Sequence, residues 1–171
     1  MAGDSFFSRD SRSVDQGLIE SVAKGAAEKA LAKLGACAPD TGRYPIVIDH
    51  DVVAEVFGLI ADYFSGKAVF EQASLFAKQD QASGKRETEL GKTIASPLLT
   101  LIDDPLLTDG VGNRTFDSEG APTRKTEIIR DGVLRGFLTN SVYAKKLSMP
   151  HTANAVRSAK GELGIGPSNL V

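Results

Sequence analysis

Two histidines and a few carboxylates are the residues of this chain that could bind a metal ion or exchange protons with a substrate. His50 and His151 are the only histidines, and they lie far apart in the sequence. A zinc-peptidase helix places two histidines one turn apart, so that both imidazoles face one ion and a glutamate serves as the base. No such pair is present in this sequence. The simplest interpretation is that His50 stands at the start of a helix and that His151 lies in a loop.

The acidic residues allow a second interpretation. Asp103 and Asp104 end an apolar run, and Asp117 and Glu119 precede a Gly-Ala-Pro turn. Paired carboxylates can hold a cation or act as acid and base, but Asp beside Pro or Gly is also ordinary turn chemistry. The turn interpretation is favoured. The alternative is a scattered metal site in which both histidines are joined by Asp103, Asp117 or Glu119.

Helical periodicity marks the segments that must position these residues. Over residues 15–34 the apolar positions recur at helical spacing and are mostly alanine, which predicts a helix packed closely against another element. A second helix is predicted over residues 51–64, with Ser65 and Gly66 as its stop, and a short one over Ser141–Leu147.

Short apolar runs predict strands over residues 44–48 and 96–103. The intervening residues 67–93 are polar and mixed in charge, so we expect a long surface loop there. The tail from Pro150 onward reads as loop.

A β-hairpin is the strongest local prediction. Residues 126–129 and 133–138 alternate in polarity and flank Arg130, Asp131 and Gly132. Asp-Gly suits a type I′ turn, because both central residues of that turn need positive φ. Together the elements predict an α+β fold: an antiparallel, partly barrel-like sheet with two main packed helices, in a single domain over residues 1–171.

Composition excludes several functional classes. The formal net charge is -2 and the pI is about 5.7, so no global basic field is available to hold a nucleic acid. No apolar run approaches the ~18 residues of a membrane span. The first residues lack the apolar core of a signal peptide, and Cys37 is the only cysteine, so the expected location is cytoplasmic.

Several motifs resemble the TldD/PmbA family, in one order along most of the chain. Residues 116–124 (FDSEGAPTR) and 128–138 (IIRDGVLRGFL) resemble the family's FDDEG-x-PT-R and GVLKG-x-L block. Residues 96–105 (SPLLTLIDDP) resemble its ASPLLTIVDDP segment, and residues 166–170 (GPSNL) resemble its PSNL. One departure is Ala153, which stands where the family usually has the glycine of Thr-Gly-Asn. If that position needs a positive φ, alanine destabilises it.

The resemblance implies a subunit role. Family members of the TldD kind carry a His-Glu-x-x-x-His zinc helix, whereas the PmbA (TldE) kind lacks it and pairs with the first. The equivalent segment here, residues 51–60, has no histidine pair. The resemblance therefore implies a non-catalytic PmbA-like subunit or fragment without a cofactor of its own. A TldD-like partner would bind the zinc, in a dimer that degrades or processes unfolded and leader peptides. The family's other name, modulator of DNA gyrase, does not imply contact with DNA.

The expected mechanism is strand addition. A peptide would pair with the segments around residues 96–103 and 126–138 through main-chain hydrogen bonds that ignore its sequence. The candidate substrate contacts are Arg124, Arg135 and Asn154. The rival hypothesis is a stand-alone metal-dependent peptidase that uses the scattered histidine and carboxylate site.

Overall fold

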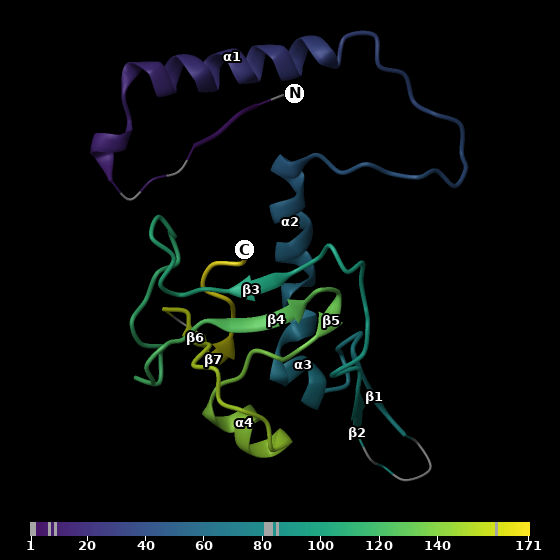
Figure 1. Cartoon of the computed structure of the whole chain (residues 1–171), viewed down its shortest axis with the longest axis vertical. Helices are drawn as coiled ribbons and strands as arrows, with labels where there is room; N and C mark the ends of the chain where they lie inside the picture. The colour runs from purple at the N-terminus through teal and green to yellow at the C-terminus, as the bar shows by residue number, and fades with distance from the viewer. Residues whose placement is uncertain (1–2, 7, 9, 81–83, 85, 160) are drawn as a thin grey trace. The chain divides into compact units, whose positions relative to one another are not determined.

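A computed structural model describes residues 3–6, 8, 10–80, 84, 86–159 and 161–171. The chain forms two compact units, Met1–Val47 and Ile48–Val171, and each is described by itself (Figure 1). The single domain predicted over residues 1–171 stays a prediction. Among the described residues, no helix combines the length and the apolar character needed to cross a membrane.

The first unit contains one long helix, α1 (Gln16–Ala32), which follows the short 3-10 helix η1 (Ser11–Ser13). Asp15 caps α1 by accepting a hydrogen bond from the Leu18 backbone N–H at 2.8 Å. The helix predicted over residues 15–34 is confirmed, but none of its residues is buried.

The strand predicted over residues 44–48 is wrong. This segment has no regular structure, and Ile46 and Val47 are 81% and 97% exposed. An apolar run becomes a strand only where a neighbouring strand pairs with its backbone, and no described residue does so here.

The described residues of the second unit form four helical segments. Helix α2 (His50–Ile60) tightens into the 3-10 helix η2 (Ala61–Phe64), which confirms the helix predicted over residues 51–64. Ser65 ends η2 and caps α3 (Gly66–Phe70). The short helix α4 (Ser141–Leu147) is present as predicted.

Residues 67–93 do not form one continuous surface loop. They include most of α3 and a hairpin made of β1 (Ala77–Gln79) and β2 (Arg86–Thr88). The ring of Phe76, which precedes β1, stacks on Phe64 with 4.7 Å between the ring centroids. This aromatic contact holds the hairpin to the core, although most of its residues are polar.

A three-stranded antiparallel sheet carries the predicted hairpin. Its order is β3 (Leu101–Asp103), β4 (Thr126–Arg130) and β5 (Val133–Leu134). Asp131 and Gly132 have φ values of 51° and 77°, as the type I′ turn requires. Apolar side chains from this sheet pack with those of η2 and α3, and the buried core includes Phe64, Val69, Leu101, Ile128, Ile129, Leu134, Phe137 and Leu138.

Both outer edges of this sheet are covered by other segments of the chain. Beside β3, Ile102 and Val171 exchange two backbone hydrogen bonds of 2.8 and 2.9 Å. Beside β5, the Leu134 N–H donates to Lys92 and its carbonyl accepts from Gly91. The sheet is therefore neither a closed barrel nor open at its edges.

A third hairpin among the described residues replaces the loop predicted for the tail. Strands β6 (Ala155–Arg157) and β7 (Leu163–Ile165) pair antiparallel. Ala155 is fully buried, and its carbonyl accepts a hydrogen bond from the Ser118 N–H at 3.1 Å. The sequence shows little alternation here, and the strands form because their neighbours pair with them.

Asp103 joins three segments of the second unit. It is 1% exposed, and its Oδ1 accepts hydrogen bonds from the backbone N–H groups of Ser168 (2.6 Å) and Asn169 (3.1 Å). Its Oδ2 accepts a bond of 2.6 Å from Nδ2 of Asn154. Burial raises the pKa of Asp103 above its ordinary value, and the bonds from Asn154 and Ser168, the charge of Arg114 and the bond from Asn169 only partly oppose that effect.

The turn that precedes β6 contains a strained residue. Ala153 has a φ of 59° and is 1% exposed. The position therefore does need the left-handed conformation that glycine tolerates, and alanine occupies it at a cost.

Replacing Gly132 with alanine should destabilise the hairpin more than the same change at Gly120. Both residues have positive φ, so both substitutions carry a left-handed penalty of roughly 1–2 kcal/mol. Only at Gly132 would the new Cβ collide with a backbone atom, the carbonyl oxygen of Ala95, whereas Gly120 faces open space. Urea unfolding of both variants measures the difference; equal losses would contradict the tight contact.

Replacing Ala153 with glycine should stabilise the protein. Relief of the left-handed penalty, roughly 1–2 kcal/mol, exceeds the added flexibility of glycine, about 0.5–1 kcal/mol. The matched control is Ala155→Gly, two residues on in extended β6, which should lower the free energy of unfolding. Thermal or urea unfolding compares them, and a loss of stability in both variants would refute the strain.

The stability contributed by Asp103 should fall as the pH rises. Its folded-state pKa lies above the ordinary value of 3.8, so the folded state holds the proton more tightly than the unfolded state. The contribution is fully present below that ordinary value and is lost as the pH rises through the raised folded-state pKa. Unfolding free energies of the wild type and Asp103→Asn, measured from about pH 4 to about pH 7, should show this difference shrinking. Parallel curves would exclude it.

Candidate functional site

A groove of about 200 Å³ opens beside the β4–β5 hairpin. Strand β4, the segment after β5 and the segment after α4 contribute its walls, and the residues that line it are Leu90, Thr126, Glu127, Arg135, Gly136, Phe137, Met149, Pro150 and Thr152. Phe137 belongs to the buried core, and Met149 packs against it. The groove therefore has an apolar floor, which suits the side chain of an extended peptide.

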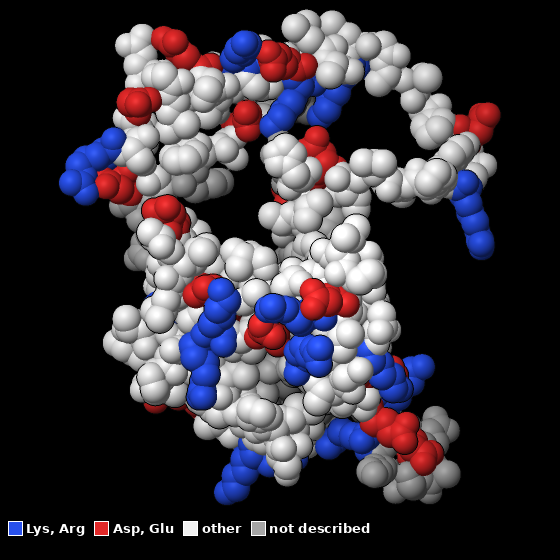
Figure 2. Space-filling model, in the orientation of Figure 1, with Lys and Arg blue, Asp and Glu red and all other residues white. Residues whose placement is uncertain are grey.

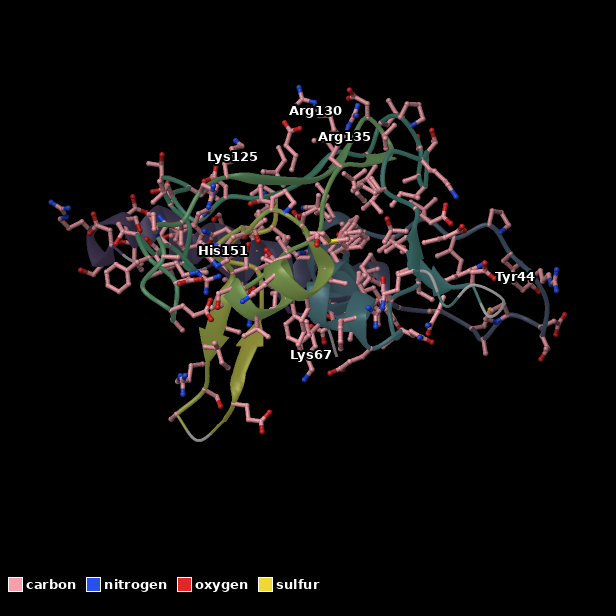
Figure 3. The ribbon with its side chains drawn as sticks, turned by 90° about the horizontal axis from the view of Figure 1, so that it is seen from below. Tyr44, Lys67, Lys125, Arg130, Arg135 and His151 are labelled. Carbon is pink, nitrogen blue, oxygen red and sulfur yellow. The ribbon has the colours of Figure 1, made fainter. Side chains whose placement is uncertain are left out.

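Charged residues stand around this groove. The Arg135 N–H donates to the Ile128 carbonyl at 2.8 Å, which fixes the backbone of Arg135 against β4. Arg135 forms no ion pair with a described residue, whereas Glu127 is bound by Arg130 at 2.7 Å. Figure 2 shows basic and acidic side chains interspersed over the three-stranded sheet, and Figure 3 shows Lys125, Arg130 and Arg135 on one side of it. Arg135 is thus the cation available to a ligand in the groove.

The structure separates the three predicted substrate contacts. Arg135 lines the groove. Arg124 is exposed and is not among the lining residues. Asn154 is 1% exposed, and its Nδ2 donates to Asp103 and to the Gly166 carbonyl. As folded, Asn154 links parts of the chain and does not face a ligand.

One histidine does meet two carboxylates. Ligand atoms of Asp117, Glu119 and His151 lie within 4.8 Å of one another. Asp117 Oδ1 accepts hydrogen bonds of 2.9 Å from the backbone N–H groups of Glu119 and Ala121, so the turn interpretation of this acid is confirmed. Its Oδ2 accepts from the Ala155 N–H at 3.1 Å.

Glu119 is bound in the same way. Its two oxygens accept from the N–H and the hydroxyl of Ser141, at the start of α4, and His151 Nε2 lies 3.6 Å from Oε2. Burial alone would raise the pKa of Glu119, but the bonds from Ser141 and the contact with His151 outweigh it and lower this pKa.

This donor set does not fit a resident zinc ion well. It offers one imidazole, and every oxygen of its two carboxylates already accepts from a protein donor. His50 is not part of the group; it starts α2 beside Asp49. Phe57 and Ile60 of α2 pack against the core, as expected for an apolar stripe.

Sequence reasoning missed two features of the site. Leu90 of the groove comes from a segment that was interpreted as a loop, Met149 was assigned to no element, and Ser141 was not linked to Glu119. No local pattern connects residues so far apart in the chain. The Ser at the start of α4 was the one available signal, because such residues occur at helix N-termini.

Comparison with known proteins bears on this geometry. The profile of the PmbA/TldA metallopeptidase C-terminal domain matches residues 41–171. A metalloprotease of Methanothermobacter thermautotrophicus is 35% identical over 144 residues, which are 84% of this chain and 29% of that protein. The metalloprotease PmbA of Escherichia coli O157:H7 is 29% identical over 80% of this chain and 28% of its own length. The chain thus spans less than a third of the length of these relatives.

Solved structures agree on the fold. A Thermotoga maritima protein described as a modulator of a DNA gyrase aligns with a TM-score of 0.75 and 25% identity over 95% of this chain and 34% of its own. TldE from Thermococcus kodakarensis aligns with a TM-score of 0.67 and 24% identity over 89% of this chain and 33% of its own, which supports the fold alone. From these matches and the motifs, the chain belongs to the TldD/PmbA family, and residues 41–171 correspond to its PmbA/TldA metallopeptidase C-terminal domain.

Proposed function

We propose that this chain is a non-catalytic, PmbA-like part of a TldD/PmbA-type metallopeptidase that binds unfolded or leader peptides. Zinc chemistry would be supplied by a TldD-like partner subunit in a dimer. The assembly would act in the cytoplasm, without a nucleic acid or a membrane. The role of this chain is to hold the peptide.

The observation that carries the proposal is the groove beside Arg135. Its apolar floor can take one side chain of an extended peptide, and Arg135 can bind an acidic group or a peptide carbonyl next to it. The first contact needs only an apolar side chain and the second only a carbonyl or an acidic group, so neither requires a long sequence motif. That property suits a subunit whose ligands are unfolded chains.

The metal-ligating side chains of the described residues support a non-catalytic role. Helix α2 carries its single histidine at its first residue, and its inward residues are apolar. The carboxylates near His151 are occupied in holding a turn to α4. The rival, a stand-alone peptidase, would have to use that cluster.

Strand addition remains the proposed mode of peptide binding. Of the edges expected to receive the peptide, that of β3 is paired with Val171 and that of β5 with residues 91–93. A peptide adding there would displace those segments. An edge without such a neighbour is the better position.

Replacing Arg135 with alanine should weaken peptide binding by about tenfold or more. A hydrogen bond to a charged group contributes about 1.5–3 kcal/mol, and each 1.4 kcal/mol is a factor of ten in Kd. The probe is a fluorescent unstructured peptide with a leucine beside a glutamate, titrated by anisotropy with and without a TldD-like partner. Arg124→Ala, an exposed arginine outside the groove, is the matched control and should bind as the wild type does.

Two results would contradict the proposal. One is the absence of saturable binding by the wild type under either condition. The other is stoichiometric zinc in the purified chain that is lost, together with peptidase activity, on His151→Ala. The second result would favour the stand-alone enzyme.

A further inference from the structure

Strand β7 has one edge that no described residue pairs with. The Gly166 N–H donates to the Asn154 carbonyl at 3.0 Å, so Val156 and Gly164 form the next hydrogen-bonded pair of the β6–β7 ladder. Ile165 and Leu163 occupy the alternate positions, and their N–H and C=O groups point away from β6. On the opposite side of the hairpin, the same alternation directs the groups of Ala155 to Asp117 and Ser118, which bind them.

A cavity of about 320 Å³ lies along this unpaired edge. Gly164 and Ile165 line it on one side, and the other side includes Asp62 of η2, Lys67 of α3 and Glu71, which follows α3. Figure 3 shows the β6–β7 hairpin standing out from the rest of the unit. The side chain of Lys67, a residue of α3, lies beside it. Leu163, Gly164 and Ile165 are each half-buried, so this edge is partly open to a ligand.

The charged side chains that line this cavity are available to a ligand. Asp62, Lys67 and Glu71 form no ion pair with a described residue. The lining holds two carboxylates and one ammonium, so it is acidic by one charge. A ligand with a basic side chain complements it.

We propose that the free edge of β7 binds the backbone of an extended peptide as a third strand, with a basic side chain of that peptide between Asp62 and Glu71. The outward N–H and C=O groups of Leu163 and Ile165 are separated by two residues of strand, roughly 7 Å. The backbone groups of an extended peptide repeat at the same spacing. A helix uses its own backbone groups internally and cannot bind such an edge. Gly164 has no side chain to obstruct the approach.

This inference rests on the proposed function for the nature of the ligand, and it locates the strand addition. The groove beside Arg135 is a separate surface, because the two sets of lining residues share no member. Each site can therefore fail without the other.

Amide hydrogen exchange tests the edge directly. The probe is a peptide of alternating threonine and valine with one central lysine, added to the whole chain at saturation. The Ile165 amide should exchange quickly in the free protein and at least tenfold more slowly with peptide. The Gly164 amide, which is bonded to β6 already, should not change. An Ile165 amide unaffected by bound peptide would overturn the proposal.

Two variants give an independent reading. Ile165→Pro removes the outward N–H without breaking a bond to β6, and it should weaken binding at least tenfold. Glu71→Lys leaves the strand unchanged. It should lower the affinity for the lysine peptide and raise the affinity for a peptide with glutamate in place of that lysine. An unchanged ratio of the two affinities would refute the site. If the wild type binds the probe and only Arg135→Ala weakens it, the edge proposal fails while the proposed function stands. If no peptide binds at all, both fail.

Discussion

The buried carboxylate of Asp103 is the interaction on which the second unit depends. It sits at the end of β3 and binds the start of the Ser168–Asn169 segment and the side chain of Asn154. Asp103 is separated from Asn154 by 51 residues and from Ser168 by 65 residues, so these bonds join distant parts of the sequence. A charge in this position is costly to bury, so the surrounding donors must be complete for the arrangement to be stable. Asn154 directly precedes β6, and the Ser168–Asn169 segment leads to Val171, which covers the edge of β3, so Asp103 helps to fix both of these features.

What could be predicted from the sequence is what depends on neighbours in the chain. The Asp-Gly turn, α1, α2 and α4 have their periodicity, caps and stops within a few residues, and all were found. Residues 44–48 have the composition of a strand, but no described strand pairs with them. Strands β6 and β7 lack the alternating pattern of a strand, but they pair with each other. Pairing across long separations decides strands, and single-sequence reasoning cannot supply it.

The same division applies to the site. Arg135 could be predicted as a substrate contact because the hairpin that carries it could be predicted. Asn154 was selected as a polar residue in a family-like motif, and the structure shows it bound inside. Glu119 and Asp117 were interpreted as turn residues, which is their main role, but the closeness of His151 depends on α4 folding back onto that turn.

The turn at Gly132 has a consequence for how the molecule assembles. Its N–H donates to the Leu99 carbonyl, and its own carbonyl accepts from the N–H groups of Ile94 and Ala95. A loop that looks self-contained is thus completed by residues more than thirty positions earlier. The turn at Gly132 cannot be completed before residues 94–99 have come into place. The slowest folding step should therefore include closure of the loop between residues 99 and 132. The folding rate should depend on this topology more than on the local turn propensity.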